Sequence, residues 1–397
     1  MVKRGKSALL IQFIRWVMMH LPSKTKKFLS MAFPMMIISF LIHYRRVLKM
    51  LVLHAGERSA KIIKKMPTVV ANKFYVSPFF FSSYAQCFIG TKRLNPNKDL
   101  IHIIEMFDFP NGGKCILDWY SFKTRSVNYH PEVIVMVVPG TNTPSNSNYL
   151  EDLAVDLLNN NYQAVLFSPR VNQERFHAPT EGYWDTLKDL HDAIEHVRTK
   201  QPGHKIMLVG HSYGGNTVCN YLARYSENPG VMGGISLANP FDIATVSNRI
   251  LGTLIDKWLM KGIIIKAQLH REYLETIKDK FMFNVDAIVG AKSFQTFERE
   301  FIMKAMGFKD LVEYYDGTSS SKILTKIKHP CLLVNSLDDP FIDRKILPMN
   351  IHNENPNVIL VLTQKGGHLG WVEGIIKQNR WSTRVILEYI SAVRTTA

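Results

Sequence analysis

Ser212 has the residue type and the local pattern that nucleophilic chemistry needs. It stands at the centre of Gly210-His211-Ser212-Tyr213-Gly214, a G-x-S-x-G segment between the apolar run Lys205–Val209 and the helical pattern Gly214–Tyr225. The two glycines allow a sharp turn from strand to helix, which lifts the serine hydroxyl above the sheet. The N-terminus of the following helix stabilises developing negative charge. This context favours a nucleophile over a simple glycine turn.

A serine nucleophile needs a base and a group that orients the base. His368 follows the apolar run VILVL, and Asp338-Asp339-Pro340 follows the apolar run CLLVN. Both lie at the C-terminal ends of predicted strands, the edge where open α/β sheets bind ligands. We predict His368 as the base and Asp339 as its orienting acid, because Asp339 precedes Pro340 and lies four residues past Asn335. Asp338 is expected to point away and to cap a turn.

Acyl transfer also needs two backbone N–H groups that hold the oxyanion. One is expected at Tyr213, directly after the nucleophile. The other is expected in the loop VPGTNTPSNSNY, which follows the apolar run Val133–Val138. Gly140 permits a turn there, so we predict Thr141 as the second donor and Asn142 as the lesser alternative. A plain glycine loop without this role is the competing interpretation.

Short apolar runs that alternate with helical patterns must position these residues. The strand candidates are Ile101–Phe107, Cys115–Ser121, Val133–Val138, Ala164–Phe167, Lys205–Val209, Gly234–Ala238, Pro330–Asn335 and Val358–Leu362. The helix candidates are Tyr149–Asn159, Trp184–Thr199, Gly214–Tyr225 and Arg344–His352. Runs that are apolar throughout indicate strands covered on both faces, so we predict an α/β fold with a mostly parallel sheet. Phe241–Ser321 interrupts the alternation and is interpreted as an inserted helical cap.

The net charge of +16 is concentrated at the N-terminus. Residues 1–66 contain 14 Lys and Arg but one acid, Glu57, whereas residues 67–397 carry a net charge of only +3. A nearly neutral body argues against a broad nucleic-acid-binding face on the main domain. We therefore treat residues 1–66 as a separate basic head, followed by an aromatic-rich lead-in segment over residues 67–97.

The head contains 17 residues without Asp, Glu, Lys or Arg, from Phe28 to Tyr44, between lysines and arginines. This is near the lower limit for a membrane-spanning helix. Three interpretations remain open: a single membrane anchor, an interfacial helix pair held on anionic lipid, and an ordinary buried helix with a solvated basic face. A cleaved signal peptide fits poorly, because the apolar run starts late and no small-x-small site follows.

No cofactor or metal is expected. The four cysteines, Cys87, Cys115, Cys219 and Cys331, form no C-x-x-C pair, and the chain has neither a G-x-x-x-x-G-K-[ST] nor a G-x-G-x-x-G motif. His191 and His196 are five residues apart on one predicted helix and do not share a face, which argues against a zinc pair.

Several motifs together resemble the α/β-hydrolase fold, and more narrowly its YheT-type subgroup. That subgroup includes membrane-anchored animal hydrolase-domain lipases, plant embryogenesis-associated hydrolases and yeast fatty-acid ethyl ester synthases. The motifs span residues 98–390 and are, in order, Asn111-Gly112-Gly113 with Leu117-Asp118-Trp119, Val138-Pro139-Gly140, Gly210–Gly215, Ala238–Asp242, Asn335–Phe341 and Gly366–Gly370. The resemblance implies the triad Ser212, Asp339 and His368, the oxyanion donor Thr141 and an N-terminal membrane anchor.

Two loops depart from the pattern of this subgroup. Thr141–Pro144 stands where L-T-G-G is usual, and Ser168–Gln173 stands where HRGxGxS is usual. Both loops are expected to line the site, so we expect the substrate preference to differ from that of better-known members.

These observations predict a membrane-associated serine hydrolase that cleaves lipid esters such as glycerolipids or phospholipids, on the endoplasmic reticulum or another intracellular membrane. The predicted organisation is a head over residues 1–66, the lead-in over residues 67–97 and the hydrolase domain over residues 98–397, with the cap at about 241–321. An acyltransferase that uses the same acyl-enzyme and a non-catalytic lipid-binding protein are the alternatives. No nucleic-acid partner and no particular oligomeric state are predicted.

Overall fold

The computed structural model describes residues 34, 35, 38, 41, 42, 44, 45, 47–170, 178–179, 182–374 and 377–396. The chain divides into two compact units, Met1–Lys49 and Met50–Ala397, and the account below concerns the second. Most of the predicted apolar run Phe28–Tyr44 lies outside the described residues. Among the described residues, no helix has both the length and the apolar character needed to cross a bilayer.

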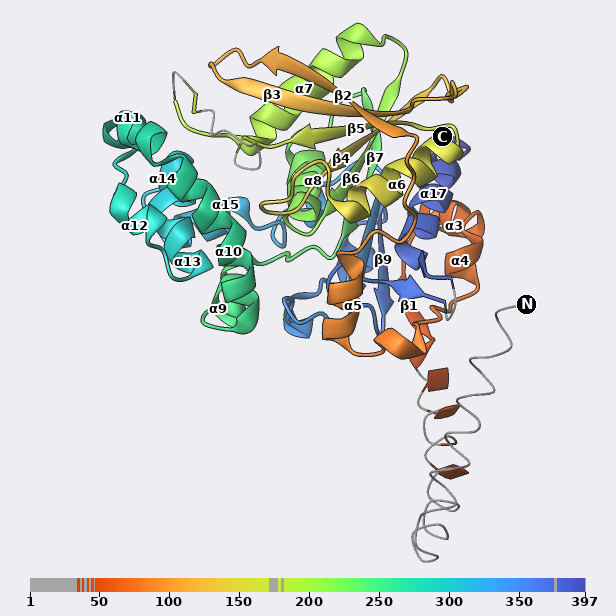
Figure 1. Ribbon diagram of the computed structural model, residues 1–397. Helices are drawn as coiled ribbons and strands as arrows, with labels where there is room; N and C mark the ends of the chain where they lie inside the picture. Colours follow the sequence, from red (N-terminus) through yellow and green to blue (C-terminus); the bar gives the residue numbers. More distant parts are fainter. Residues whose placement is uncertain are drawn as a thin grey trace, which may run out of the picture. The chain divides into compact units, whose positions relative to one another are not determined.

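A nine-stranded sheet forms the centre of the second unit (Figure 1), and its strand order is β1-β9-β8-β7-β6-β4-β5-β3-β2. The strands from β4 to β9 pair in parallel, whereas β1, β2 and β3 pair antiparallel at the edges. Every residue of β4, β8 and β9 is buried, which is why these runs are apolar throughout. The strands are β1 Met50–Leu53, β2 Leu100–Asp108, β3 Lys114–Phe122, β4 Val133–Val138, β5 Gln163–Ser168, β6 Lys205–His211, β7 Val231–Leu237, β8 Cys331–Ser336 and β9 Val358–Thr363.

Helices flank this sheet as predicted. The helix α7 (Thr186–Lys200) packs against α8 (Tyr213–Arg224), and α6 (Asn148–Asn159) packs against α17 (Trp381–Arg394). The helices α3 (Glu57–Lys64) and α4 (Pro67–Val70) also contact α17, and α5 (Ser83–Gly90) lies against the short strand β10 (Val372–Glu373). The strand β10 pairs with β11 (Asn379–Arg380) outside the main sheet.

One predicted helix and one predicted boundary differ from the structure. The predicted helix Arg344–His352 is wrong: a 3₁₀ turn, Arg344–Ile346, and a short helix α16, Ile351–Glu354, stand there instead. Pro348 lies between them and disfavours the helical conformation of the residue before it. The head boundary at residue 66 also falls inside the sheet-containing unit, because β1 pairs with β9 and α3 follows it.

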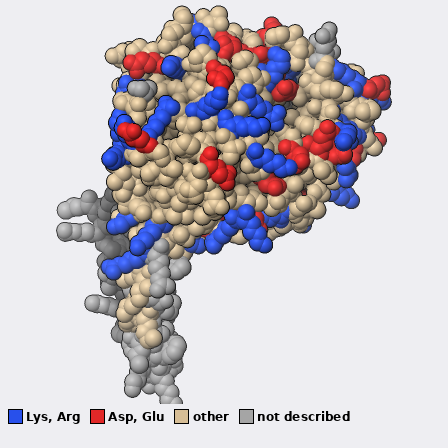
Figure 2. Space-filling view, turned by 180° about the vertical axis from the view of Figure 1, so that it is seen from behind, with Lys and Arg blue, Asp and Glu red and all other residues tan. Residues whose placement is uncertain are grey.

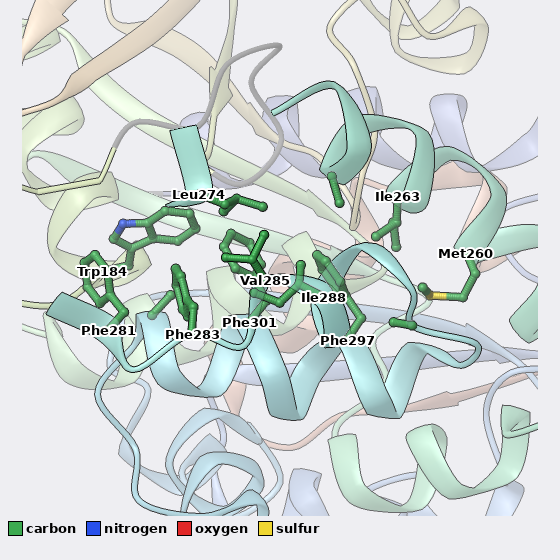
Figure 3. Close-up of a cluster of buried hydrophobic side chains, with 13 residues drawn as sticks. Trp184, Met260, Ile263, Leu274, Phe281, Phe283, Val285, Ile288, Phe297 and Phe301 are labelled. Atoms are coloured by element: carbon green, nitrogen blue, oxygen red, sulfur yellow. The ribbon is translucent and has the colours of Figure 1, made fainter. Parts of the chain in front are cut away.

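The insertion between β7 and β8 is helical. A cluster of buried side chains holds it together (Figure 3), and Trp184, just before α7, contributes to this cluster. Its helices are α9 Ile243–Ile250, α10 Leu254–Leu269, α11 Arg271–Phe281, α12 Val285–Val289, α13 Phe294–Phe297, the π-helix Glu298–Ile302, α14 Met303–Ala305 and α15 Leu311–Thr318.

The surface of the second unit carries both signs of charge. Figure 2 shows Lys and Arg interspersed with Asp and Glu across the face that it presents. This mixed pattern agrees with the small net charge of residues 67–397.

Candidate active site

Ser212 lies on the sharp turn between β6 and α8. Its backbone has φ 55° and ψ −120°, a conformation that costs a non-glycine residue free energy. The flanking glycines make this turn sterically possible. A Cβ at Gly210 would lie 2.6 Å from the carbonyl carbon of Gly214, and a Cβ at Gly214 would collide with the backbone of Val138 and Pro139. The strand-turn-helix context expected for a G-x-S-x-G segment is therefore present.

The structure brings Ser212, His368 and Asp339 together. His368 Nε2 lies 2.8 Å from Ser212 Oγ, and His368 Nδ1 lies 2.7 Å from Asp339 Oδ2. The Asp339 side chain is fully buried, whereas Ser212 and His368 are partly exposed. A buried carboxylate on one ring nitrogen and a hydroxyl on the other fix the orientation of the imidazole. This geometry suits proton transfer between Ser212 and His368.

Asp338 does not contact the His368 ring, but it does not point away from the site either. Its Oδ1 accepts a hydrogen bond of 2.9 Å from the backbone N–H of Gly367, and Lys365 Nζ lies 3.6 Å from its Oδ2. Asp338 thus accepts a backbone N–H at the start of the turn that carries His368, as a capping carboxylate does. Burial raises the pKa of Asp338.

Neighbours of Asp339 and His368 hold both side chains in place. The second carboxylate oxygen of Asp339 accepts hydrogen bonds from the backbone N–H groups of Phe341 and Ile342, at 2.8 and 3.3 Å. The Phe341 ring stacks on the His368 ring, with centroids 4.2 Å apart. The segment that follows Asp339 thus orients both side chains. Its backbone N–H groups hold the Asp339 carboxylate, and its Phe341 ring holds the His368 ring.

The lead-in segment supplies a second support that the sequence analysis missed. Gln86, on α5, is buried and exchanges hydrogen bonds with the backbone N–H and C=O of Val372 at 2.8 and 3.1 Å. The next residue, Cys87, accepts a 3.0 Å hydrogen bond from the backbone N–H of His368 through its Sγ. Burial raises the pKa of the Cys87 thiol to about 12. Gln86, between apolar residues in the stretch SYAQCFIG, was the available signal.

The predicted oxyanion donors lie on both sides of Ser212. Tyr213 is the first residue of α8, where backbone N–H groups lack partners within the helix. Across from it, a Cβ at Gly140 would lie only 3.2 Å from Ser212 Cβ, so the loop after β4 passes directly beside the serine. Thr141 and Asn142 follow, and Asn142 has φ 51°. This arrangement is compatible with one donor N–H at Tyr213 and a second in the loop after β4, at Thr141 or Asn142.

A cavity begins at this loop and extends under the insertion. It has an empty volume of about 870 Å³, part of it open to solvent. Its floor includes Thr141, Asn142 and Tyr213, and most of its remaining lining is apolar. The lining residues from the insertion are Ile263, Lys266, Phe294, Phe297, Ile302, Met306 and Tyr314. A carbonyl held beside Ser212 would thus have an apolar space next to it.

Arg170, in the segment after β5 that departs from the subgroup pattern, also borders this cavity. Its buried guanidinium forms two hydrogen bonds with the Asp189 carboxylate, at 2.7 and 2.9 Å. It also donates to Gly112 O and Asn111 Oδ1, both at 2.7 Å. Burial raises the pKa of Asp189 to about 6, although the Arg170 hydrogen bonds act in the opposite direction. Val171, Asn172 and Gln173 of the same departing segment lie outside the described residues.

Other histidines of the second unit have different partners. His211 is buried, and burial lowers its pKa to about 3, so it is neutral at physiological pH. His191 Nδ1 lies 3.1 Å from the Tyr221 hydroxyl, and His196 Nε2 lies 2.7 Å from a Glu105 carboxylate oxygen. No group of three His, Cys, Asp or Glu side chains within the described part of the chain could hold a metal ion.

Comparison with known proteins agrees with this architecture. A family model described as the alpha/beta hydrolase fold matches residues 133–374. Phospholipase ABHD3 of Bos taurus is 26% identical over 351 residues, which cover 85% of this chain and 83% of that protein. Embryogenesis-associated protein EMB8 of Picea glauca is 26% identical over 302 residues, which cover 73% of this chain and 66% of that protein. Medium-chain fatty acid ethyl ester synthase/esterase 2 of Saccharomyces cerevisiae is 23% identical over 399 residues, which cover 83% of this chain and 88% of that protein.

The family match spans more than half of the chain and includes Ser212, Asp339 and His368. Together with the mostly parallel sheet, it confirms the predicted fold, and the similarity to the embryogenesis-associated type agrees with the motifs found in the sequence. The chain belongs to the α/β-hydrolase family.

Proposed function

We propose that the protein is a serine hydrolase that cleaves carboxylic esters of lipids. The observation that carries this proposal is the continuous chain of hydrogen bonds from Asp339 through His368 to Ser212. Ser212 also lies on a strained strand-to-helix turn. This supports its nucleophilic role, because such a turn presents the hydroxyl to substrate.

In the proposed reaction, His368 Nε2 accepts the Ser212 proton while Ser212 Oγ attacks the ester carbonyl carbon. Asp339 stabilises the imidazolium that forms. The Tyr213 and Thr141 N–H groups hold the carbonyl oxygen as it becomes negative. The alcohol then leaves with the proton from His368. Water, deprotonated by the same histidine, attacks the acyl-enzyme and releases the acid and free Ser212.

A lipid ester is the proposed substrate for two reasons. The cavity beside Tyr213 is lined mostly by apolar side chains, which suits an acyl chain more than a polar leaving group. In addition, the relatives named phospholipase and fatty acid ethyl ester synthase/esterase act on acyl esters by their names. Glycerolipids and phospholipids are the classes to test first.

Labelling with a fluorophosphonate probe tests the serine mechanism. We expect the wild-type protein to be labelled and Ser212→Ala to remain unlabelled although it folds. A control serine substitution at the half-buried Ser293, which caps α13, should keep its label. If the wild type stays unlabelled while a control hydrolase reacts, the proposal fails. If the wild type is labelled at Ser212, lipid profiling of cells that carry Ser212→Ala identifies the substrate as the lipid class that accumulates.

Acyl transfer to an alcohol is a second candidate, supported by the relative named as both synthase and esterase. The same acyl-enzyme would be attacked by an alcohol in place of water. Incubation with an acyl ester and increasing ethanol separates the two reactions. A rise in new ethyl ester at the expense of free acid would favour transfer, whereas an unchanged acid yield would favour hydrolysis.

We further propose that the N-terminal segment before β1 associates the protein with a membrane, as the ten Lys and Arg of residues 1–49 on both sides of an uncharged run of 17 residues support. Alkaline carbonate extraction of cell membranes tests the mode. Retention of the protein would favour a spanning anchor, release would favour an interfacial segment, and recovery in the soluble fraction before extraction would contradict the proposal.

A further inference from the structure

The insertion helix α10 is apolar on two opposite faces. Its inner residues Met260, Ile263 and Ala267 belong to the buried cluster of the insertion (Figure 3). Its outer face carries Leu254, Trp258, Ile265 and Leu269, which are 82, 62, 52 and 77% exposed. A helix at the surface of a protein normally has a polar outer face. The exposed row therefore needs an apolar partner.

The spacing of the exposed residues makes them one continuous surface. They are separated by four, seven and four residues, which places them along one side of an α-helix. From Leu254 to Leu269 this row is about 22 Å long. Leu251, just before the helix, is 45% exposed and extends it at one end. We call this row, Leu251 to Leu269, the outer face of α10.

The charges beside the outer face are positive. Lys257 and Lys261 are exposed on the same side of α10, and neither has an ion pair within the part of the chain that the structure describes. The acid of this helix, Asp256, is buried and accepts backbone hydrogen bonds from Gly252 and Phe294. An apolar row with a tryptophan and unpaired lysines has the chemistry of a helix that lies in the interface of an anionic bilayer.

The same helix also borders the cavity beside Ser212. Ile263 and Lys266 line that cavity, and a Cβ at Gly262 would lie 2.8 Å from the side-chain amide of Asn142 in the predicted oxyanion loop. The outer face and the cavity wall are thus two sides of one helix. Contact of the outer face with a bilayer would bring the cavity within one helix diameter of the lipid.

We propose that the outer face of α10 docks on an anionic lipid bilayer and that this contact is additional to any contact made by the basic head. Trp258 and the flanking leucines enter the interface, and Lys257 and Lys261 pair with lipid phosphates or carboxylates. Docking requires no catalysis, so it is measurable in full-length Ser212→Ala protein, whatever becomes of the proposed hydrolase activity.

Quenching of tryptophan fluorescence by brominated lipids tests this surface. The full chain is mixed with phosphatidylcholine–phosphatidylserine vesicles that contain brominated acyl chains. We expect strong quenching that falls in Trp258→Phe, which keeps an apolar side chain but loses the exposed indole. Trp184→Phe is the matched control, because Trp184 is 6% exposed and packs against the buried cluster of the insertion, so its loss should leave the quenched signal unchanged. Equal quenching in wild type and Trp258→Phe would overturn the proposal.

Charge and apolarity are tested separately on the same signal. Lys257→Glu with Lys261→Glu should lower the docked-to-undocked ratio more than tenfold, since each basic residue near an anionic surface contributes a factor of about five. Lys123→Glu, at another exposed lysine, should have little effect. Leu254→Ser with Leu269→Ser should abolish the Trp258 signal, whereas Ile104→Ser, at an exposed apolar position on β2, should preserve it.

A second copy of the chain is the competing occupant. Sedimentation in detergent-free buffer distinguishes the two, with circular dichroism to verify folding. A dimer that Leu254→Ser with Leu269→Ser converts to a monomer, without Trp258-dependent quenching in vesicles, would replace the bilayer by a protein partner. A monomer with Trp258-dependent quenching supports the bilayer.

Discussion

Asp339 Oδ2 lies 2.7 Å from His368 Nδ1, whereas the preceding carboxylate, Asp338, bonds the backbone N–H of Gly367. Two adjacent acids of one loop thus support the same histidine in different ways. Asp339 acts on the imidazole ring directly, and Asp338 acts on the backbone that carries it. The chain turns at Leu337 and Asp338, directly after β8, and the two adjacent side chains reach different partners from this turn.

Substitution of each acid by its amide separates these roles. Asp339→Asn should lower kcat by about 10⁴-fold, because an amide cannot stabilise the imidazolium and favours the wrong tautomer. Asp338→Asn keeps an acceptor oxygen for Gly367 and should lower kcat by less than about tenfold. Steady-state hydrolysis of a short-chain ester measures both. A larger loss in Asp338→Asn than in Asp339→Asn would contradict the assignment of Asp339.

The glycines beside Ser212 should be intolerant of any side chain. Gly210→Ala would place a Cβ 2.6 Å from the Gly214 carbonyl carbon, and backbone cannot yield as a flexible side chain can. We expect a loss of at least about 3 kcal/mol in the free energy of unfolding. Gly203→Ala is the control. It has a positive φ but open space around it, so about 1 kcal/mol of backbone strain is expected.

Urea unfolding, read by circular dichroism, measures these differences. Fluorophosphonate labelling of the same samples reports whether the turn still presents Ser212. Equal stability of Gly210→Ala and Gly203→Ala would mean that the turn relaxes without strain, and the steric account would then be wrong.

Much of the fold and of the site could be predicted from local pattern. Strands such as Val133–Val138 are buried on both faces, so their sequences are apolar throughout and their ends are visible. Ser212, Asp339 and His368 each follow such a strand, which is why their positions at one sheet edge could be inferred from chain order.

What local pattern could not predict is long-range pairing. The strand β1, Met50–Leu53, looks like part of the basic head, and only its pairing with β9 assigns it to the sheet. The helix α17, Trp381–Arg394, was not expected at all, although it packs on β7 and α6. The contact of Gln86 with Val372 joins residues 286 positions apart, and no spacing rule connects them.

Gln86 should matter for both stability and catalysis. Gln86→Ala leaves the buried N–H of Val372 and the carbonyl of Phe80 without this partner, whereas the Val372 carbonyl keeps its hydrogen bond from the Ser77 N–H, so the cost should be about 2–4 kcal/mol. Because Val372 follows the loop of His368, we also expect kcat to fall more than KM rises. Urea unfolding and steady-state kinetics at a temperature where the variant is folded separate the two effects.

Cys87→Ser is the matched control for Gln86→Ala. Its hydroxyl can still accept the hydrogen bond from the His368 backbone N–H, so activity should stay within about threefold of wild type. A normal kcat in folded Gln86→Ala would show that α5 contributes stability alone and does not position His368.

The insertion should lose stability as pH rises, because of Glu298. This residue is fully buried in the π-helix, and burial raises its pKa to about 7, against hydrogen bonds from Ser247 and Tyr315 that act to lower it. The native state therefore binds the proton more tightly than the unfolded chain, whose glutamate has an ordinary pKa of about 4.5. The stabilising contribution is fully present below pH 4.5 and is lost as pH rises through 7.

Glu298→Gln removes this titration while it keeps an oxygen that can accept from Ser247 and Tyr315. A shift from 4.5 to about 7 corresponds to about 3 kcal/mol, so relative to wild type the variant should gain up to that amount between pH 5 and pH 8. Thermal unfolding at a series of pH values measures the difference. Parallel profiles for wild type and Glu298→Gln would contradict the prediction, since the pH dependence would then originate in other buried acids such as Asp189, whose pKa burial raises to about 6. Asp189→Asn in the Glu298→Gln background would then flatten the profile that remains.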